Sequence, residues 1–282
     1  MEADIRHTLR KFNLRPVKSL GQNFVTDRDV LEKMAEAVGL DKEDIVLEIG
    51  PGTGSLTSVL AEKAGKVVAV EIDRRLIPVL HENLKEYSNV HVINADILKL
   101  DIGNMLVPYL DKGRRLKIAA NLPYYITTPV IMKLLEHDTG AKTMVFMVQK
   151  EVACRMKAKP GGKDYSALSI AVQYYSRPTV VFDVPPQAFI PRPDVYSSVI
   201  KLEIFDRPPV EVRDEALFFR LVKAAFAQRR KTLANALINS GYFGLDREKT
   251  GAMLSELGIG KKQRGETLTI EQFAQLANYL SS

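Results

Sequence analysis

The sequence contains one cysteine and no long apolar run, and each scarcity excludes a class of protein. Cys154 is the only cysteine among 282 residues, so disulfides within the chain and metal centres built from several cysteines are excluded. No apolar run approaches the ~18 residues that a membrane-spanning helix needs. The N-terminal residues are polar and charged, without the apolar core of a secretory signal. We therefore expect a globular, cytoplasmic protein that binds no metal.

The excess of positive over negative charge is also small. The chain has 40 Lys/Arg and 34 Asp/Glu, and the net charge of +6 fits an anionic partner. Pro208-Pro209 indicates a linker, and residues 207–282 beyond it hold 12 Lys/Arg against 8 Asp/Glu. We predict two domains, 1–206 and 207–282. The first begins with a basic arm at 1–20, whose cations are Arg6, Arg10, Lys11, Arg15 and Lys18.

The stretch 45–49 is short, apolar and rich in β-branched residues, which is typical of a buried parallel strand. It is followed by three alternating glycines, Gly50, Gly52 and Gly54, and then by a helical pattern. Backbone N–H groups in such a turn can approach a ligand closely. A dinucleotide fingerprint needs a further glycine at Ser55 or Thr57, and both positions lack one. The pattern instead resembles the cofactor loop of S-adenosylmethionine-dependent methyltransferases, although a purely structural turn is the alternative.

Polar side chains follow three predicted strands at the point where each strand ends. The strands lie at 66–70, 90–94 and 116–120, and the residues that follow them are Glu71, Asp96 and Asn121. Because the carboxyl ends of parallel strands meet at one edge, these side chains lie where open α/β sheets bind ligands. We expect Glu71 to accept hydrogen bonds from ribose hydroxyls and Asp96 to meet an adenine amino group. The alternative is that both acids are simply exposed at strand ends.

Four more β-rich segments bring the candidate strands to eight, enough for a seven-stranded sheet: 143–149, 169–175, 179–184 and 197–205. We predict an α/β fold with a doubly wound, methyltransferase-type sheet and a small C-terminal all-helical domain. Helices are expected from Thr26 or Asp27 to Val38, over 74–87, 215–239 and 246–257, and after a capping box at Thr269–Gln272. The tetrapeptide Gly21–Phe24 fits no periodic pattern, which indicates a polar turn or a lid over the cofactor.

The tetrapeptide Asn121-Leu122-Pro123-Tyr124 has a composition suited to methylating adenine. The exocyclic amine is a poor nucleophile because its lone pair is delocalised into the ring. The Asn121 oxygen and the Leu122 carbonyl, held by Pro123, can localise that lone pair by accepting hydrogen bonds from the amine. Tyr124 can stack on a flipped base and hold it in line with the methyl donor. The methylated amine is acidic, so no strong general base is required. As an isolated tetrapeptide it could equally form a turn.

Over nearly its whole length the chain resembles the small-subunit ribosomal RNA adenine N6,N6-dimethyltransferase family. The resemblance rests on seven motifs: Leu20–Phe24, Glu48–Gly54, Glu71–Asp73, Asn121–Tyr125, Gln149–Ala153, Phe189–Val195 with Ser197, and Phe226–Leu233. It implies that Phe189 faces Tyr124 across the target adenine. It also implies cofactor contacts, and with the residues beside them the expected cofactor site comprises Asn23, Val25, Gly50, Gly52, Gly54, Glu71, Ile72, Asp96, Ile97 and Asn121. Val25 stands where leucine is commoner in the family, a change that a backbone contact would tolerate.

The resemblance implies a reaction and a partner. The family transfers two methyl groups from S-adenosylmethionine to each of two adjacent adenosines, in the loop of the 3′-terminal hairpin of small-subunit ribosomal RNA. S-adenosylhomocysteine is the other product. We therefore expect the small ribosomal subunit as partner, a role linked to its biogenesis, and a monomeric enzyme.

Two other functions remain open at this point. A relative that dimethylates large-subunit RNA and confers macrolide resistance is disfavoured by the segments Gln228–Lys231 and Phe189–Ser197. A non-catalytic RNA-binding assembly factor is disfavoured by the intact glycine loop and Asn121–Tyr124. A DNA adenine methyltransferase shares the chemistry but commonly has proline where Leu122 stands.

Two groups of cations are candidates for binding RNA. Gln228–Lys231 places consecutive cations within the predicted helix 215–239, and residues 150–163 hold five more around a Pro-Gly-Gly turn. Both segments could be solvated surface instead. The residues that we expect to contact RNA phosphates are Arg229, Arg230, Lys231, Arg155 and Lys157.

Overall fold

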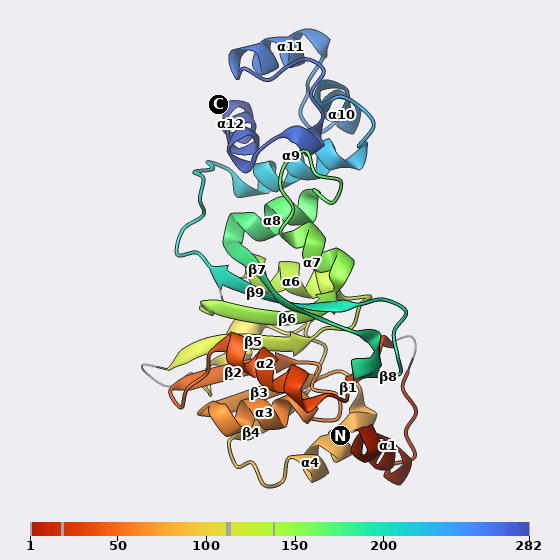
Figure 1. Ribbon diagram of the computed structural model, residues 1–282. Coiled ribbons are helices and arrows are strands. Elements are labelled where there is room, and N and C mark those ends of the chain that lie inside the picture. The colour runs from red at the N-terminus through yellow and green to blue at the C-terminus, as the bar shows by residue number, and fades with distance from the viewer. Residues whose placement is uncertain (1, 18–19, 111–113, 138, 282) are drawn as a thin grey trace. The chain divides into compact units, whose positions relative to one another are not determined.

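The computed structural model describes residues 2–17, 20–110, 114–137 and 139–281 and is shown in Figure 1. Lys18 of the predicted basic arm lies outside these residues. The chain forms two compact units, Met1–Ala153 with Arg177–Ile204, and Cys154–Ser176 with Phe205–Ser282. The third crossing between the units, at 204/205, lies near the predicted boundary at 206/207. The segment Cys154–Ser176, which we assigned to the first domain, packs with the C-terminal helices instead.

The first unit is built on the predicted seven-stranded sheet (Figure 1). In sheet order the strands are β4 (Val90–Asn94), β3 (Lys66–Glu71), β2 (Asp44–Ile49), β5 (Arg115–Asn121), β6 (Thr143–Gln149), β9 (Ser197–Ile204) and β7 (Ser176–Val184). Strands β4 to β6 are mutually parallel, and β9 is antiparallel to β6. The chain order reverses between β2 and β5, and such a switch point is where doubly wound sheets bind their ligands.

The sequence indicated three helices of the first unit, and its described residues form four more. The three indicated helices are α2 (Arg28–Val38), α3 (Ser55–Lys63) and α4 (Ile77–Asn83), and the others are α1 (Glu2–Lys11), α5 (Ile102–Leu106), α6 (Thr127–Glu136) and the start of α7 (Lys150–Met156). Asp27 caps α2 by accepting the Asp29 N–H at 3.0 Å, which confirms the second of the two predicted caps. The helix predicted over 74–87 begins as a 3₁₀ turn, η2 (Arg74–Leu76), and α4 ends at Asn83.

The core of this unit lies between α2, α3 and the central strands. Met34 and Leu60 from the two helices are fully buried in one cluster with Val46, Val67 and Ala119 from three neighbouring strands. Burying a side chain of this size contributes about 1.5–3 kcal/mol each. The strand ends are therefore held at defined positions, and the loops that follow them inherit that precision.

A two-stranded sheet joins two segments that lie far apart in the sequence. Strand β1 (Phe24–Val25) pairs antiparallel with β8 (Phe189–Ile190), with Val25 opposite Phe189. The Thr26 N–H extends the pairing by donating to the Ala188 carbonyl at 2.8 Å. This ladder fixes the segment that contains Gly21–Phe24 against the chain after β7, so the tetrapeptide is not an isolated turn.

The second unit is helical. Its helices are α8 (Ala167–Tyr175), α9 (Glu215–Ala227), α10 (Leu233–Ser240), α11 (Arg247–Glu256) and α12 (Ile270–Leu280). The strand predicted at 169–175 is wrong, since these residues belong to α8. Ser169 accepts the Ser166 N–H at 3.0 Å and so closes the first turn of that helix. Tyr174 then packs on Phe218 of α9, with ring centroids 5.1 Å apart.

The continuous helix predicted over 215–239 is also wrong. Helix α9 ends at Ala227, Gln228–Lys231 form a turn, and Thr232 caps α10 by accepting the Asn235 N–H. The cap competes with helix continuation because the threonine hydroxyl satisfies an N–H that would otherwise need a carbonyl of the preceding turn. The capping box at Thr269 and Gln272 is confirmed. Within the described residues no helix combines the length and apolar character required to cross a membrane.

Candidate active site

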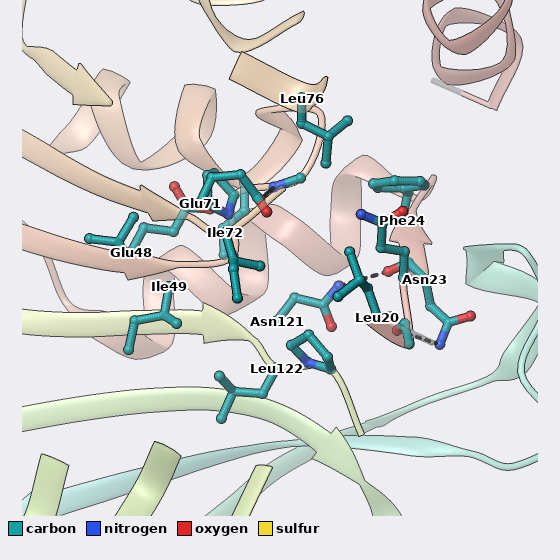
Figure 2. A pocket seen from close by; sticks show the side chains of 18 of the residues that line it. Leu20, Asn23, Phe24, Glu48, Ile49, Glu71, Ile72, Leu76, Asn121 and Leu122 are labelled. Carbon is teal, nitrogen blue, oxygen red and sulfur yellow. Dashed lines mark hydrogen bonds between the residues drawn. The ribbon is translucent and has the colours of Figure 1, made fainter. Parts of the chain in front are cut away.

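A cavity opens where the carboxyl ends of β2, β3 and β5 meet, and residues 20–25 form one of its walls (Figure 2). Most residues predicted for the site line it: Asn23, Val25, Gly50, Gly52, Glu71, Ile72, Asp96, Ile97, Asn121, Leu122, Pro123 and Tyr124. Gly54 and Phe189 do not. Residues that lie far apart in the sequence, between 23 and 124, thus meet at the edge of the sheet where the parallel strands end.

The three glycines of the loop border different surroundings. Gly50 has φ +69°, and a Cβ there would meet nothing within 4 Å, so the backbone borders open space. Gly52 has φ +62°, and a Cβ would lie 3.0 Å from the Phe24 ring. Gly54 faces away from the cavity, because its Cβ would lie 3.3 Å from Leu80 and Leu84. Gly50 therefore admits a ligand close to the backbone, Gly52 lets the Phe24 ring approach the loop, and Gly54 lets Leu80 and Leu84 pack against the start of α3.

Glu71 is buried and already holds the loop in place. Its carboxylate accepts the Gly52 N–H at 3.1 Å and the Asp73 N–H at 2.8 Å. Burial raises the pKa of this carboxyl, and the two backbone donors oppose that shift. A carboxylate offers about four acceptor positions, so two remain for hydroxyl donors. The neighbouring Ile72 is 48% exposed and lines the same cavity, which provides an apolar surface for a ligand to cover.

Glu48 is a site residue that the sequence reasoning quoted only as part of a motif. Its side chain is 1% exposed, lines the cavity, and has one oxygen, Oε2, without a hydrogen-bond partner among the described residues. Burial raises the pKa of Glu48 to about 8, and the Glu71 carboxylate acts in the same direction. An acid inside an otherwise apolar strand, directly before a glycine turn, is the signal that could have identified it.

Asn121 is oriented by the wall formed by residues 20–25. Its Nδ2 donates to the Asn23 carbonyl at 2.9 Å, the contact drawn in Figure 2. A carbonyl can only accept, so the amide nitrogen must face Asn23, and Oδ1 is left without a donor from the described residues. The Leu122 N–H donates to Met147 O at 3.1 Å, whereas no described residue donates to the Leu122 carbonyl. The two acceptors predicted for an incoming amine are therefore both available.

Tyr124 is held at its hydroxyl end. Its Oη lies 2.8 Å from Oγ of Ser197, a fully buried residue at the start of β9. Burial raises the pKa of Tyr124, so the ring stays neutral at physiological pH. The side chain of Phe189 is only 3% exposed and belongs to the core cluster with Val25 and Ala188. Pairing with β1 accompanies this burial, and the predicted place of Phe189 opposite Tyr124 stays a prediction.

The segment Leu20–Asn23 is tied down at both ends of the site. Gln22 accepts the Val17 N–H and donates to Asp73 Oδ2, each at 2.9 Å. The adjacent Asn23 carbonyl holds Asn121, as described above. The segment is therefore attached both to the end of β3 and to the end of β5 and forms a wall of the cavity, and its role as a lid over the cofactor stays a prediction.

All five residues predicted to contact RNA belong to the second unit. Arg229 is engaged, since Nε lies 3.0 Å from Glu266 Oε2 and the guanidinium donates to Lys163 O at 3.0 Å. The side chains of Arg230 and Lys231 have no hydrogen-bond or ion-pair partner among the described residues. Over the same described part of the chain, no group of three His, Cys, Asp or Glu side chains is arranged to hold a metal ion.

Known proteins share both the sequence and the fold. Residues 13–282 match the family described as ribosomal RNA adenine dimethylase. A protein of Alkaliphilus oremlandii named ribosomal RNA small subunit methyltransferase A is 50% identical over 276 residues, 98% of this chain and 96% of its own.

Two crystal structures extend the likeness. A dimethyladenosine transferase from Plasmodium falciparum has a TM-score of 0.74 at 28% identity, covering 90% of this chain and 95% of its own. The 23S rRNA methyltransferase ErmE has a TM-score of 0.68 at 26% identity, covering 92% and 100%. The family match covers nearly the whole chain and the Alkaliphilus oremlandii relative is 50% identical, so the chain belongs to the ribosomal RNA adenine dimethylase family.

Proposed function

We propose that this protein dimethylates N6 of two adjacent adenosines in the 3′-terminal hairpin loop of small-subunit ribosomal RNA, using S-adenosylmethionine. The family membership supports the reaction. The 50% identity to a relative named for the small subunit, against 26% for a large-subunit enzyme, supports the choice of RNA. The intact Asn121–Tyr124 site favours a catalyst over a protein that only assists assembly.

The cavity suits the cofactor in shape and in chemistry. Gly50 leaves space at the backbone, Glu71 retains acceptor positions for ribose hydroxyls, and Asp96 lines the region where an adenine would lie. Oε2 of Glu48 is a buried acceptor without a described partner, which a cationic ligand could satisfy. S-adenosylmethionine, when bound, supplies a methyl group on a sulfonium that is already activated for transfer.

Asn121 and Leu122 prepare the amine for attack. The available Asn121 Oδ1 and Leu122 carbonyl accept its two N–H groups and so draw the nitrogen lone pair out of the ring. Tyr124, held by Ser197, stacks on the base and orients it. After the first transfer one N–H remains, and a single acceptor is enough for the second. The proton then leaves to solvent, since the methylated amine is strongly acidic.

The hydrogen bond from Asn121 Nδ2 to Asn23 O is the observation that carries this mechanism, because it leaves Oδ1 free to accept. Unmethylated small subunits and large subunits are each incubated with the enzyme and labelled S-adenosylmethionine, and the label is mapped. We expect label on two neighbouring adenosines near the 3′ end of small-subunit RNA. Label in large-subunit RNA would support the macrolide-resistance relative instead, and no label would support the assembly factor.

Asn121→Ala tests the lone-pair mechanism directly. Removing one preorganised polar contact typically slows a reaction about 10²–10³-fold. The rate is measured in single turnover with the cofactor saturating, because Asn121 also lines the cofactor cavity. A normal rate under these conditions would show that the amine is activated in some other way.

The second unit would position the RNA while the first extracts the base. Arg230, Lys231, Arg155 and Lys157 are its candidate phosphate contacts, and Arg229 would join them on releasing Glu266. Phosphate contacts supply affinity and register rather than sequence recognition. We further propose that the enzyme acts as a monomer in the cytoplasm, where its ribosomal substrate is assembled.

A further inference from the structure

A second cavity, of about 440 Å³, lies beside the first in the same unit. The two share Tyr124 and the wall residues Gly21, Gln22 and Asn23, so Tyr124 borders both. The other walls come from Gln149 and from the segment Pro191–Val195, which follows β8. Apart from Tyr124 and Asn23, the mechanism above uses none of the residues that line this second cavity.

Gln149 is its most informative residue. It ends β6 and stands directly opposite Ser197 in the antiparallel β6–β9 pair. Opposed residues place their side chains on one face, roughly 5 Å apart. Ser197 in turn holds the Tyr124 hydroxyl at 2.8 Å. The Gln149 side chain therefore begins beside the residue that holds the Tyr124 hydroxyl, and no described residue forms a hydrogen bond with its amide.

The remaining wall suits a nucleotide. Pro191 and Pro193 provide rigid apolar surface, and the exposed Arg192 between them provides a cation for a phosphate. Asp194 adds an exposed carboxylate, which disfavours a free anion and is compatible with an amino group. Directly beyond, Tyr196 is 51% exposed, with its ring centroid 5.9 Å from Lys150 Nζ. Exposed aromatic rings beside cations are typical of surfaces that bind single-stranded nucleic acid.

We propose that this second cavity holds the base of the adenosine next to the one being methylated, and that Gln149 recognises its N6 edge. The proposal rests on the proposed function, in which the two modified adenosines are neighbours. A glutamine amide can pair with adenine by accepting from N6–H and donating to N7. Dimethylation removes both N6–H groups, so a finished neighbour loses this contact. Gln149 would therefore favour an RNA whose second adenosine is still unmodified.

The test uses hairpin RNAs in which one of the two adenosines is replaced by purine riboside, which has the same rings without the amino group. Methylation of the remaining adenosine is measured in single turnover, and RNA affinity is measured by fluorescence anisotropy with S-adenosylhomocysteine present. We expect the wild-type enzyme to prefer an adenosine neighbour by about tenfold, the lower range for one bidentate base contact. Gln149→Ala should treat both RNAs alike, with unchanged cofactor affinity.

Two further variants make the result specific. Gln149→Glu keeps an acceptor for N6–H and should restore the preference for an adenosine neighbour. If Gln149 had a purely structural role, replacing it would affect both RNAs to the same extent. Gln275→Ala, on the exposed face of α12, should behave as wild type. Equal binding and methylation of both RNAs by the wild type, or an undiminished preference in Gln149→Ala, would overturn the proposal. If the wild type methylated neither RNA but still bound the RNA with an adenosine neighbour more tightly, the proposed function would be wrong and the role of Gln149 would stand.

Discussion

Replacing Glu48 with glutamine should change how the stability of the protein depends on pH. The Glu48 carboxyl is fully buried, and its pKa is raised from 4.5 to about 8. A group whose pKa is higher in the folded state binds protons more tightly there than in the unfolded chain. Its contribution to stability is therefore complete below about pH 4.5 and is lost as the pH rises towards 8. Glu48→Gln keeps the shape of the protonated acid but cannot ionise.

The size of the effect follows from these two pKa values. Between pH 5 and pH 7 the Glu48 carboxyl is mostly ionised in the unfolded chain, where its pKa is 4.5. In the folded protein, where its pKa is about 8, it stays largely protonated. At 1.36 kcal/mol per pH unit, the wild type should lose about 2–3 kcal/mol relative to Glu48→Gln over this interval. Other groups, Glu71 among them, titrate in both proteins and largely cancel in the difference.

The measurement is urea unfolding of the cofactor-free protein at pH 5, 6 and 7, followed by far-ultraviolet circular dichroism. We expect the difference in unfolding free energy between Glu48→Gln and the wild type to grow steadily in favour of the variant. Glu43→Gln, an exposed carboxyl beside the start of β2, is the matched control and should show no such trend. If the Glu48→Gln and wild-type profiles ran parallel, Glu48 would be ionised in the fold and its burial would be compensated by an unidentified donor.

Three shorter predictions concern the cofactor, the base and the RNA. Glu71→Ala should weaken S-adenosylmethionine binding by about 10- to 100-fold in calorimetric titration, as loss of charge-assisted hydrogen bonds implies; unchanged affinity, or binding of NAD by the wild type, would refute the ribose role. Ser197→Ala should slow single-turnover methylation about fivefold through loss of one hydrogen bond, while cofactor affinity stays the same; a matching fall in cofactor affinity would indicate a general structural defect. Replacing Arg230 and Lys231 together with alanine should reduce the slope of subunit binding against salt by up to about two, since each released phosphate contact adds ~0.7–0.9. Arg229→Ala should change that slope less, because Arg229 is paired with Glu266; equal effects would show that this ion pair opens on binding.

Local patterns in the sequence determined the edge of the sheet and the chemistry gathered there. Parallel strands end at one edge, so a polar residue after each of three strands was enough to place Glu71, Asp96 and Asn121 in one cavity. Likewise, the cap at Asp27 and the capping box at Thr269 involve only neighbours within one helical turn. Such features are readable because donor and acceptor lie a few residues apart.

Tertiary contacts decided what local patterns left ambiguous. The apolar run at 169–175 suits a strand or a buried helix, and packing of Tyr174 on Phe218 of α9 accompanies the helical form. The two-residue strand β1 has no signal of its own and exists because β8, more than 160 residues later, supplies its partner. That pairing turns Phe189 into the core and supports the wall that orients Asn121. The acceptors of the active site are thus local in sequence, but their orientation depends on contacts between distant segments, which no sequence window contains.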